Sequence, residues 1–114
     1  TAEQKGTGRW TSQSALELGV PVPTITAAVD ARMVSGHRGL RLETAPRLGG
    51  QARRVRSSPA LARTLENALY AAELVSYAQG MHLIHRASRE YGYGVDTGEV
   101  ARIWKGGCII RSTS

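Results

Sequence analysis

The sequence predicts an all-α fold, a helical fragment built around one long central helix. Apolar residues recur at spacings of three and four in several segments, which is the period of an amphipathic helix. No alternating apolar and polar pattern of useful length indicates a strand. With 114 residues, of which 41% are apolar, the chain has room for one domain and a modest core.

Two helices are predicted in the first third of the chain. Residues 1 to 9 are polar and rich in glycine, which indicates a loop. Thr11 or Ser12 can then cap a first helix that ends at Gly19. The prolines in "VPVPT" keep residues 20 to 24 extended, because each lacks an N–H and restricts the residue before it.

The second helix is expected to begin at Thr24, acting as its cap, and to end at Gly36. Residues 36 to 58 are expected to form an irregular connection, because they contain Gly36, Gly39, Pro46, Gly49 and Gly50.

The pair Ser58–Pro59 is a strong helix start, with serine at the N-cap and proline in the first turn. Unbroken three-four spacing follows and predicts a helix of about 30 residues that ends at Tyr91 or Gly92, against a mean of about 11 to 12. Asp96 or Thr97 can cap a last short helix, which Gly106–Gly107 ends; the apolar Ile109–Ile110 follows.

The charge of the chain is positive and unevenly distributed. The net charge is +6, and seven arginines but only one acidic residue, Glu43, fall between residues 38 and 63. Such a segment can attract nucleic acid, although a solvated surface is the more ordinary interpretation. It has no interleaved aromatic residues and no zinc or RNP pattern, so we expect no specific nucleic-acid partner.

Several classes of function are not indicated. No run of 18 apolar residues predicts a membrane span, and no signal peptide is visible. The single cysteine, Cys108, cannot form an internal disulfide and fits a reducing compartment, so we expect a cytoplasmic protein. His82 and His85 lie three apart on the long helix without a third ligand at a matching spacing, so we expect no metal.

The stretch "QKGTGRWT" at 4 to 11 is the best candidate for chemistry. Lys5 and Arg9 flank a Gly-Thr-Gly turn, and a phosphate favours charged donors beside a backbone that it can approach closely. The string matches neither a Walker A nor a dinucleotide motif. On these residues alone, a phosphate site and an ordinary solvated turn both remain open.

Three separated blocks resemble the decarboxylating 6-phosphogluconate dehydrogenases. They are "QKGTGRWT…ALELGVPV", "ALYAAELVSYAQGMHLIHRASREYG" and "GEVARIWKGGCIIRS", in the order of that family and over more than half the chain. Arg9 stands where the family's "GTGKWT" has a lysine, which keeps the charge but changes its geometry.

The resemblance implies an enzyme that oxidises 6-phosphogluconate with NADP and decarboxylates it to ribulose 5-phosphate. It implies an N-terminal NADP-binding domain, a large all-α domain, and a tail that reaches into the partner subunit of a homodimer. Residues 1–114 resemble only a part of the C-terminal helical domain. We therefore expect NADP to be bound by an absent N-terminal domain, the catalytic lysine and glutamate to lie upstream of residue 1, and the fragment alone to be inactive.

The same resemblance assigns three substrate-binding residues. The family's substrate-contacting lysine, in "QKGTG", corresponds to Lys5, and the threonine near the substrate phosphate corresponds to Thr7. The arginine that binds the same phosphate, 27 residues after the lysine, corresponds to Arg32 in "AAVDAR". Two alternatives remain: a stand-alone helical interaction module, and a basic nucleic-acid binder that uses the arginines of segment 38–63.

Overall fold

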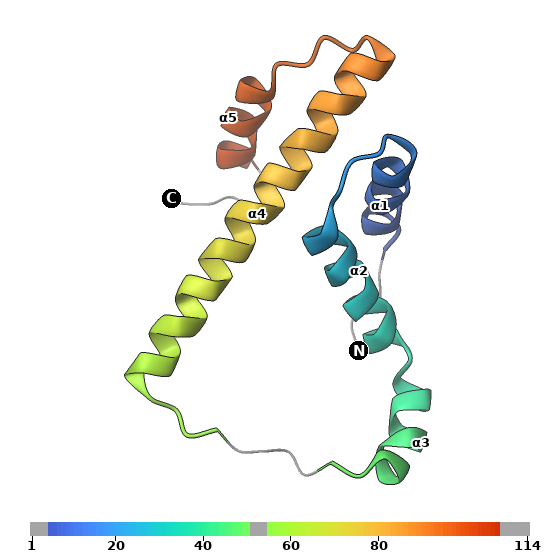
Figure 1. Cartoon of the computed structure of the whole chain (residues 1–114), viewed down its shortest axis with the longest axis vertical. Helices are drawn as coiled ribbons and strands as arrows, with labels where there is room; N and C mark the ends of the chain where they lie inside the picture. The colour runs from blue at the N-terminus through green and yellow to red at the C-terminus, as the bar shows by residue number, and fades with distance from the viewer. Residues whose placement is uncertain (1–4, 51–54, 108–114) are drawn as a thin grey trace.

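The computed structural model describes residues 5–50 and 55–107, and within these ranges it consists of helices joined by short connections (Figure 1). The helices are α1 (Thr7–Glu17), α2 (Pro23–Gly36), α3 (Arg38–Leu48), α4 (Pro59–Tyr91) and α5 (Thr97–Gly107). The all-α prediction is confirmed. In the part of the chain that the structure describes, no helix is long and apolar enough to cross a membrane.

The long central helix is also confirmed. Its first turn is capped by Ser58, whose Oγ accepts a hydrogen bond of 3.1 Å from the backbone N–H of Leu61, and Pro59 occupies the first helical position. Gly92 ends α4 with a φ of 68°, a left-handed conformation that costs glycine little. Both ends of this 33-residue helix therefore follow from local chemistry.

Helices α1 and α2 form an antiparallel pair that packs on α4 (Figure 1). The chain reverses at Gly19, and the backbone N–H of Val20 then bonds the carbonyl of Ala15 over 2.8 Å. Ala15, Val20 and Val22 are buried together with Leu83 of α4. This small core fixes the α1–α2 turn against the C-terminal half of the long helix.

Helix α5 folds back along α4 (Figure 1). Asp96 caps it, since its Oδ1 accepts from the backbone N–H groups of Gly98 at 2.8 Å and Glu99 at 3.3 Å. The rings of Tyr77 and Trp104 meet edge to face, with centroids 5.8 Å apart. Cys108 and the pair Ile109–Ile110 lie outside the described residues.

Three predicted features are wrong. The first helix begins at Thr7 instead of after Thr11 or Ser12, and Thr11 instead donates to the carbonyl of Thr7 inside the helix. The cause is Gly6, whose φ of 105° redirects the chain and places the helix start immediately after it. Helix α2 begins at Pro23, so Thr24 lies within its first turn and does not act as the N-cap.

The third error concerns residues 36 to 58, where α3 replaces part of the expected irregular connection. Between Gly39 and Pro46 the chain has six residues free of glycine and proline, and the hydroxyl of Thr44 bonds the carbonyl of Leu40 over 2.8 Å. Pro46 is tolerated because the helix ends only two residues later, at Leu48.

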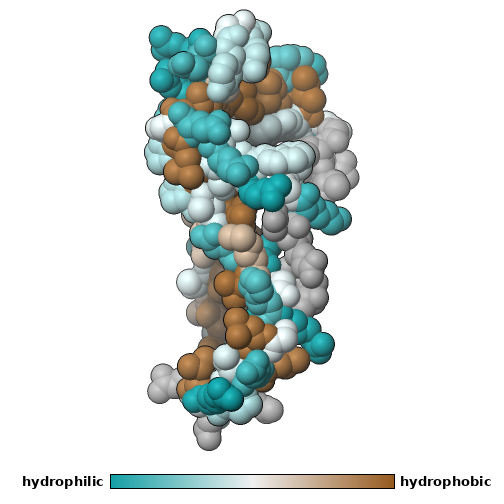
Figure 2. Space-filling view, turned by 90° about the vertical axis from the view of Figure 1, so that its right-hand side faces the viewer, coloured by the Kyte–Doolittle hydropathy of each residue, from teal (hydrophilic) through white to brown (hydrophobic). Residues whose placement is uncertain are grey.

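Helix α3 is exposed along most of its length and mixes basic with apolar side chains. Figure 2 shows brown, apolar patches beside teal, hydrophilic ones at the end of the molecule where α3 lies. The exposed apolar residues there are Leu40, Leu42 and Leu48. Arg41 is hydrogen bonded to the end of α2, because its Nη2 donates to the carbonyl of Ser35 over 2.9 Å.

Candidate anion-binding site

The candidate site lies at the N-terminus of α1. Lys5 precedes the helix, Thr7 is its first residue, and Gly6 at the N-cap position has no side chain that could cap the first turn. The first helical hydrogen bond runs from the N–H of Trp10 to the carbonyl of Gly6 over 2.9 Å. The first N–H groups of a helix have no partner within the helix, and the helix dipole adds positive potential there, which favours an anion.

The packing of α1 on α2 determines which part of α2 lies beside this helix start. Near the turn, Ser12 Oγ and Thr26 Oγ1 are 3.3 Å apart. One turn closer to the start of α1, Gly8 approaches Val29 so closely that a Cβ on residue 8 would lie 2.8 Å from Val29 Cγ2. A residue larger than glycine would hold the two helices further apart.

These contacts define an antiparallel register that leads to the predicted residues. Two contacts establish it: a step of four residues toward the start of α1, from Ser12 to Gly8, is matched by a step of three toward the end of α2, from Thr26 to Val29. Arg32 lies a further three residues along α2, and Lys5 precedes the first residue of α1. The structure therefore brings Lys5, Thr7 and Arg32, which are separated by up to 27 positions in sequence, to the same end of the α1–α2 pair.

The three side chains suit an anion chemically. All are exposed and hence accessible to a ligand. Arginine offers two parallel N–H donors, lysine a compact charge and threonine a hydroxyl donor, so together they can surround the oxygens of a phosphate dianion. Arg9 lies exposed in the same first turn and adds a further positive charge.

The usual sequence patterns do not predict the helix N-terminus in this site. A serine, threonine, aspartate or asparagine commonly marks such a start, whereas here the N-cap position holds glycine. Glycine is also favoured at the N-cap position, so Gly6 is the residue that could have indicated a helix start at Thr7.

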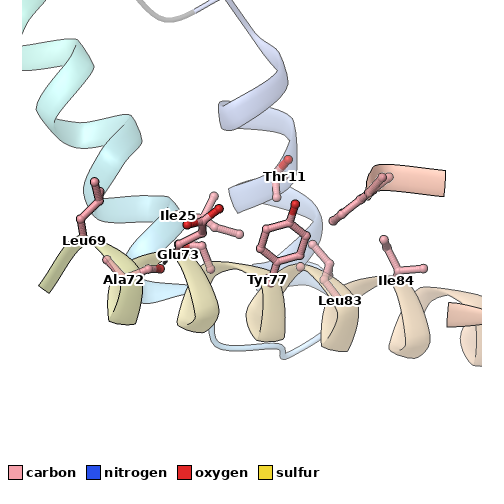
Figure 3. Close-up of a pocket in the computed structure, with 11 residues that line it drawn as sticks. Thr11, Ile25, Leu69, Ala72, Glu73, Tyr77, Leu83 and Ile84 are labelled. Atoms are coloured by element: carbon pink, nitrogen blue, oxygen red, sulfur yellow. Dashed lines mark hydrogen bonds between the residues drawn. The ribbon is translucent and has the colours of Figure 1, made fainter. Parts of the chain in front are cut away.

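A separate groove of about 830 Å³ runs between the helices, and its mostly apolar lining is unsuited to an anion. Residues of α4 form its floor, and Figure 3 shows Tyr77 rising from α4 toward Thr11 of α1. Its lining residues are Thr11, Ile25, Leu69, Ala72, Glu73, Ser76, Tyr77, Gly80, Leu83, Ile84 and Trp104. Among them Glu73 alone is charged, and a carboxylate repels a phosphate.

The other candidate residues do not form a metal-binding or catalytic cluster within the described part of the chain. His82 and His85 are both exposed on α4, and no group of three potential metal ligands occurs in residues 5–50 and 55–107. Among the carboxyl groups of the described residues, the pKa of Glu99 alone is lowered, because Glu99 hydrogen bonds with Arg102 on α5. This pair lies on α5, a different helix from those that carry the anion-binding residues.

Comparison with known proteins matches the whole chain to one family. The model of the 6-phosphogluconate dehydrogenase C-terminal domain covers residues 1–114. This chain belongs to the 6-phosphogluconate dehydrogenase family. Its strings "SYAQG" and "GGCIIRS" lie in the two later blocks on which the resemblance was based.

Relatives in the family carry the same description. A decarboxylating 6-phosphogluconate dehydrogenase of Synechocystis is 52% identical over 112 residues, which is 97% of this chain and 23% of that protein. One of Schizosaccharomyces pombe is 46% identical over 112 residues, again 97% of this chain and 23% of the relative. One of Arabidopsis thaliana is 47% identical over 114 residues. The chain thus spans about a quarter of the length of these relatives.

Proposed function

We propose that this chain supplies the substrate-phosphate contacts and part of the helical scaffold of an enzyme that converts 6-phosphogluconate to ribulose 5-phosphate by NADP-dependent oxidative decarboxylation. Membership of the 6-phosphogluconate dehydrogenase family supports the reaction. The observation that carries the role of this chain is the register of α1 on α2, which leads Lys5 and Arg32 to one end of the pair. Family membership favours this proposal over a stand-alone interaction module or a nucleic-acid binder.

In this proposal the phosphate of the substrate binds at the N-terminus of α1. The Arg32 guanidinium donates two parallel hydrogen bonds to the phosphate, and the Lys5 ammonium and the Thr7 hydroxyl donate to its other oxygens. The phosphate is remote from the carbon that reacts. Its binding energy is therefore used to hold and orient the substrate rather than to move electrons.

NADP does not fit the residues of this chain. The described part contains no strand, and the sequence has no G-x-G-x-x-G motif that could open a dinucleotide fold. We assign NADP binding and the catalytic lysine and glutamate to other parts of the enzyme. A homodimer and a cytoplasmic location belong to the same proposal.

The test uses a chimeric enzyme in which this chain replaces the matching quarter of the Synechocystis relative. A charge-assisted hydrogen bond contributes roughly 1.5–3 kcal/mol, so Lys5→Ala should raise the KM for 6-phosphogluconate about tenfold to a hundredfold. Arg32→Ala should cost at least as much, and Arg32→Lys should recover only part, because lysine cannot donate in the bidentate manner.

The controls separate phosphate binding from other effects. The KM for NADP should stay unchanged in all three variants. Arg63→Ala removes a cation from α4, away from the site, and should leave both KM values unchanged. If Lys5→Ala and Arg32→Ala both leave the kinetics with 6-phosphogluconate unaltered, the phosphate assignment is wrong. If the chimera with the unchanged chain does not turn over 6-phosphogluconate, the assigned function is wrong.

A further inference from the structure

Helix α2, which carries Arg32, lacks a cap of its own. Its N-cap position is Val22, whose side chain cannot accept a hydrogen bond, and Pro23 at the first position has no N–H. The next backbone N–H, that of Thr24, donates over 3.1 Å to Oε1 of Gln79 on α4. The cap of α2 is therefore supplied by a side chain 55 residues away in sequence.

Gln79 makes a second bond to the same residue. Its Nε2 donates to Oγ1 of Thr24 over 3.0 Å, so both polar atoms of the carboxamide are used, and both contacts are partly buried. Leu83, one turn further along α4, belongs to the core that holds the α1–α2 turn. The polar pair and the core contact together attach the beginning of α2 to α4.

The attachment is at one end of α2, and Arg32 is toward the other. Figure 1 shows α2 close to α4 at its beginning and increasingly distant from it toward Gly36. Arg32 lies eight residues after Thr24, which corresponds to about 12 Å along the helix. A change of about 5° in the direction of α2 at Thr24 would move Arg32 by about 1 Å.

We propose that Gln79 is a positioning residue for the phosphate site: by capping α2 at Thr24 it sets the direction of the helix that carries Arg32. A displacement of about 1 Å in a substrate-positioning group is enough to cost up to about a hundredfold in rate. This inference rests on the proposed function, because it assumes that Arg32 binds the phosphate.

Gln79→Leu in the chimeric enzyme keeps the approximate size of the side chain and removes both hydrogen bonds. We expect the KM for 6-phosphogluconate to rise about tenfold, with the KM for NADP unchanged and kcat reduced by less than the KM is raised. Thr64→Val is the matched control, because Thr64 also lies on α4 and its hydroxyl bonds only the carbonyl of Ala60 within that helix. This control should leave both KM values unchanged.

Gln79→Glu should preserve the capping of α2 and therefore the KM for 6-phosphogluconate. A carboxylate oxygen can accept from the Thr24 N–H, the Thr24 hydroxyl can turn to donate to the other oxygen, and a negative charge is favourable at a helix N-terminus. We expect its KM for 6-phosphogluconate to lie within about twofold of that of the unchanged chain. A KM as high as that of Gln79→Leu would contradict the role of the cap.

The strongest test combines the two positions. If Gln79 acts through Arg32, then in the Arg32→Ala background the further change Gln79→Leu should leave the already raised KM nearly unaltered. Additive effects of the two changes would overturn the proposal. A Gln79→Leu enzyme with a lower Tm but an unchanged KM would show that the contact is purely structural, and would also overturn it.

The outcomes separate this inference from the proposed function. Arg32→Ala alone tests the phosphate assignment, and a raised KM there with an unchanged KM in Gln79→Leu rejects only the positioning role. Should Gln79→Leu fail to give folded enzyme, Thr24→Val decides. It keeps the backbone bond and loses the hydroxyl, so the KM should rise about threefold, and an unchanged KM would reject the proposal.

Discussion

Gly8 contributes to the packing of α1 on α2 next to the proposed site. It lies in the first turn of α1, and the space a side chain would need is occupied by Val29 of α2, which is buried. Glycine weakens a helix relative to alanine by about 1 kcal/mol, so its presence inside α1 has a cost. The close approach of α1 to α2 that it permits lies at the end of the pair that carries the proposed site.

Gly8→Ala should therefore lower stability and weaken the phosphate site together. A new Cβ 2.8 Å from Val29 Cγ2 forces the helices apart, because the β-branched valine cannot easily turn away. The gain in helix propensity offsets part of this cost, so we expect the free energy of unfolding of the chimeric enzyme to fall by about 1–2 kcal/mol. Urea denaturation measures this, and the KM for 6-phosphogluconate should rise.

The control for this prediction is the double change Gly8→Ala with Val29→Ala. It removes the methyl groups that the new Cβ would meet, so the KM should return toward that of the unchanged chain although a buried valine has been lost. A Gly8→Ala enzyme with an unaltered urea midpoint and KM would show that α1 and α2 do not need this close approach.

At the scale of elements, α5 offers a local test of its surface electrostatics. Arg102 Nε donates to Glu99 Oε2 over 2.8 Å, three residues apart on the same helix. This bond lowers the pKa of Glu99 below its ordinary value of 4.5, against opposing contributions from desolvation and from the nearby charge of Asp96. Both side chains are exposed to solvent, so the effect of the pair on stability is small.

The sign of the pH dependence follows from that lowered pKa. Because the folded value lies below the unfolded one, the stabilisation is present above about pH 4.5 and is lost as the pH falls through the folded pKa. Arg102→Gln should raise the pKa of Glu99, as measured by NMR titration of its side chain. A Glu99 pKa that is the same in both proteins would show that the hydrogen bond does not persist in solution.

Helix α4 carries many apolar residues that the other described helices leave exposed. Along residues 68 to 84, "ALYAAELVSYAQGMHLI", apolar residues occupy all sides of the helix, which is typical of a helix surrounded by others. Figure 1 shows α2 and α5 beside the middle and the C-terminal part of α4, whereas no described helix lies beside its N-terminal end. Leu65, Leu69, Leu74 and Val75 are accordingly between 47% and 72% exposed.

The whole molecule is open for its length. Its radius of gyration is 18.0 Å, whereas a compact domain of this many residues has about 13 Å. Its accessible surface is 9336 Å², against about 6,100 Å² for a compact protein of the same mass. Only Ala15, Val20, Val22, Val29 and Leu83 are buried apolar residues in the described part.

We therefore expect the 114-residue chain, expressed alone, to self-associate and to bind a dye for apolar surfaces. Sedimentation velocity over a range of concentrations measures the association. Leu69→Glu places a charge on the exposed floor of the groove and should reduce both association and dye binding, while Glu66→Gln on the same helix should not. A clean monomer without dye binding would contradict this expectation.

The sequence by itself determined the helical class and the limits of α4 and α5, because each depends on local chemistry. A capping serine or aspartate, a proline in the first turn and a left-handed glycine act through neighbouring residues, so their effect can be predicted from the order of the chain. The resemblance of three blocks likewise identified the family that the comparisons show.

Tertiary structure decided how α2 begins and what lies beside it. Its cap is Gln79, a partner 55 residues away that no local pattern indicates, so the sequence assigned that role to Thr24. The placement of the start of α1 beside the later part of α2 depends on the contact of Gly8 with Val29, which exists only once α1 and α2 have packed. Contacts between distant residues arise from the packing of complementary surfaces, and the order of residues along one helix does not contain that information.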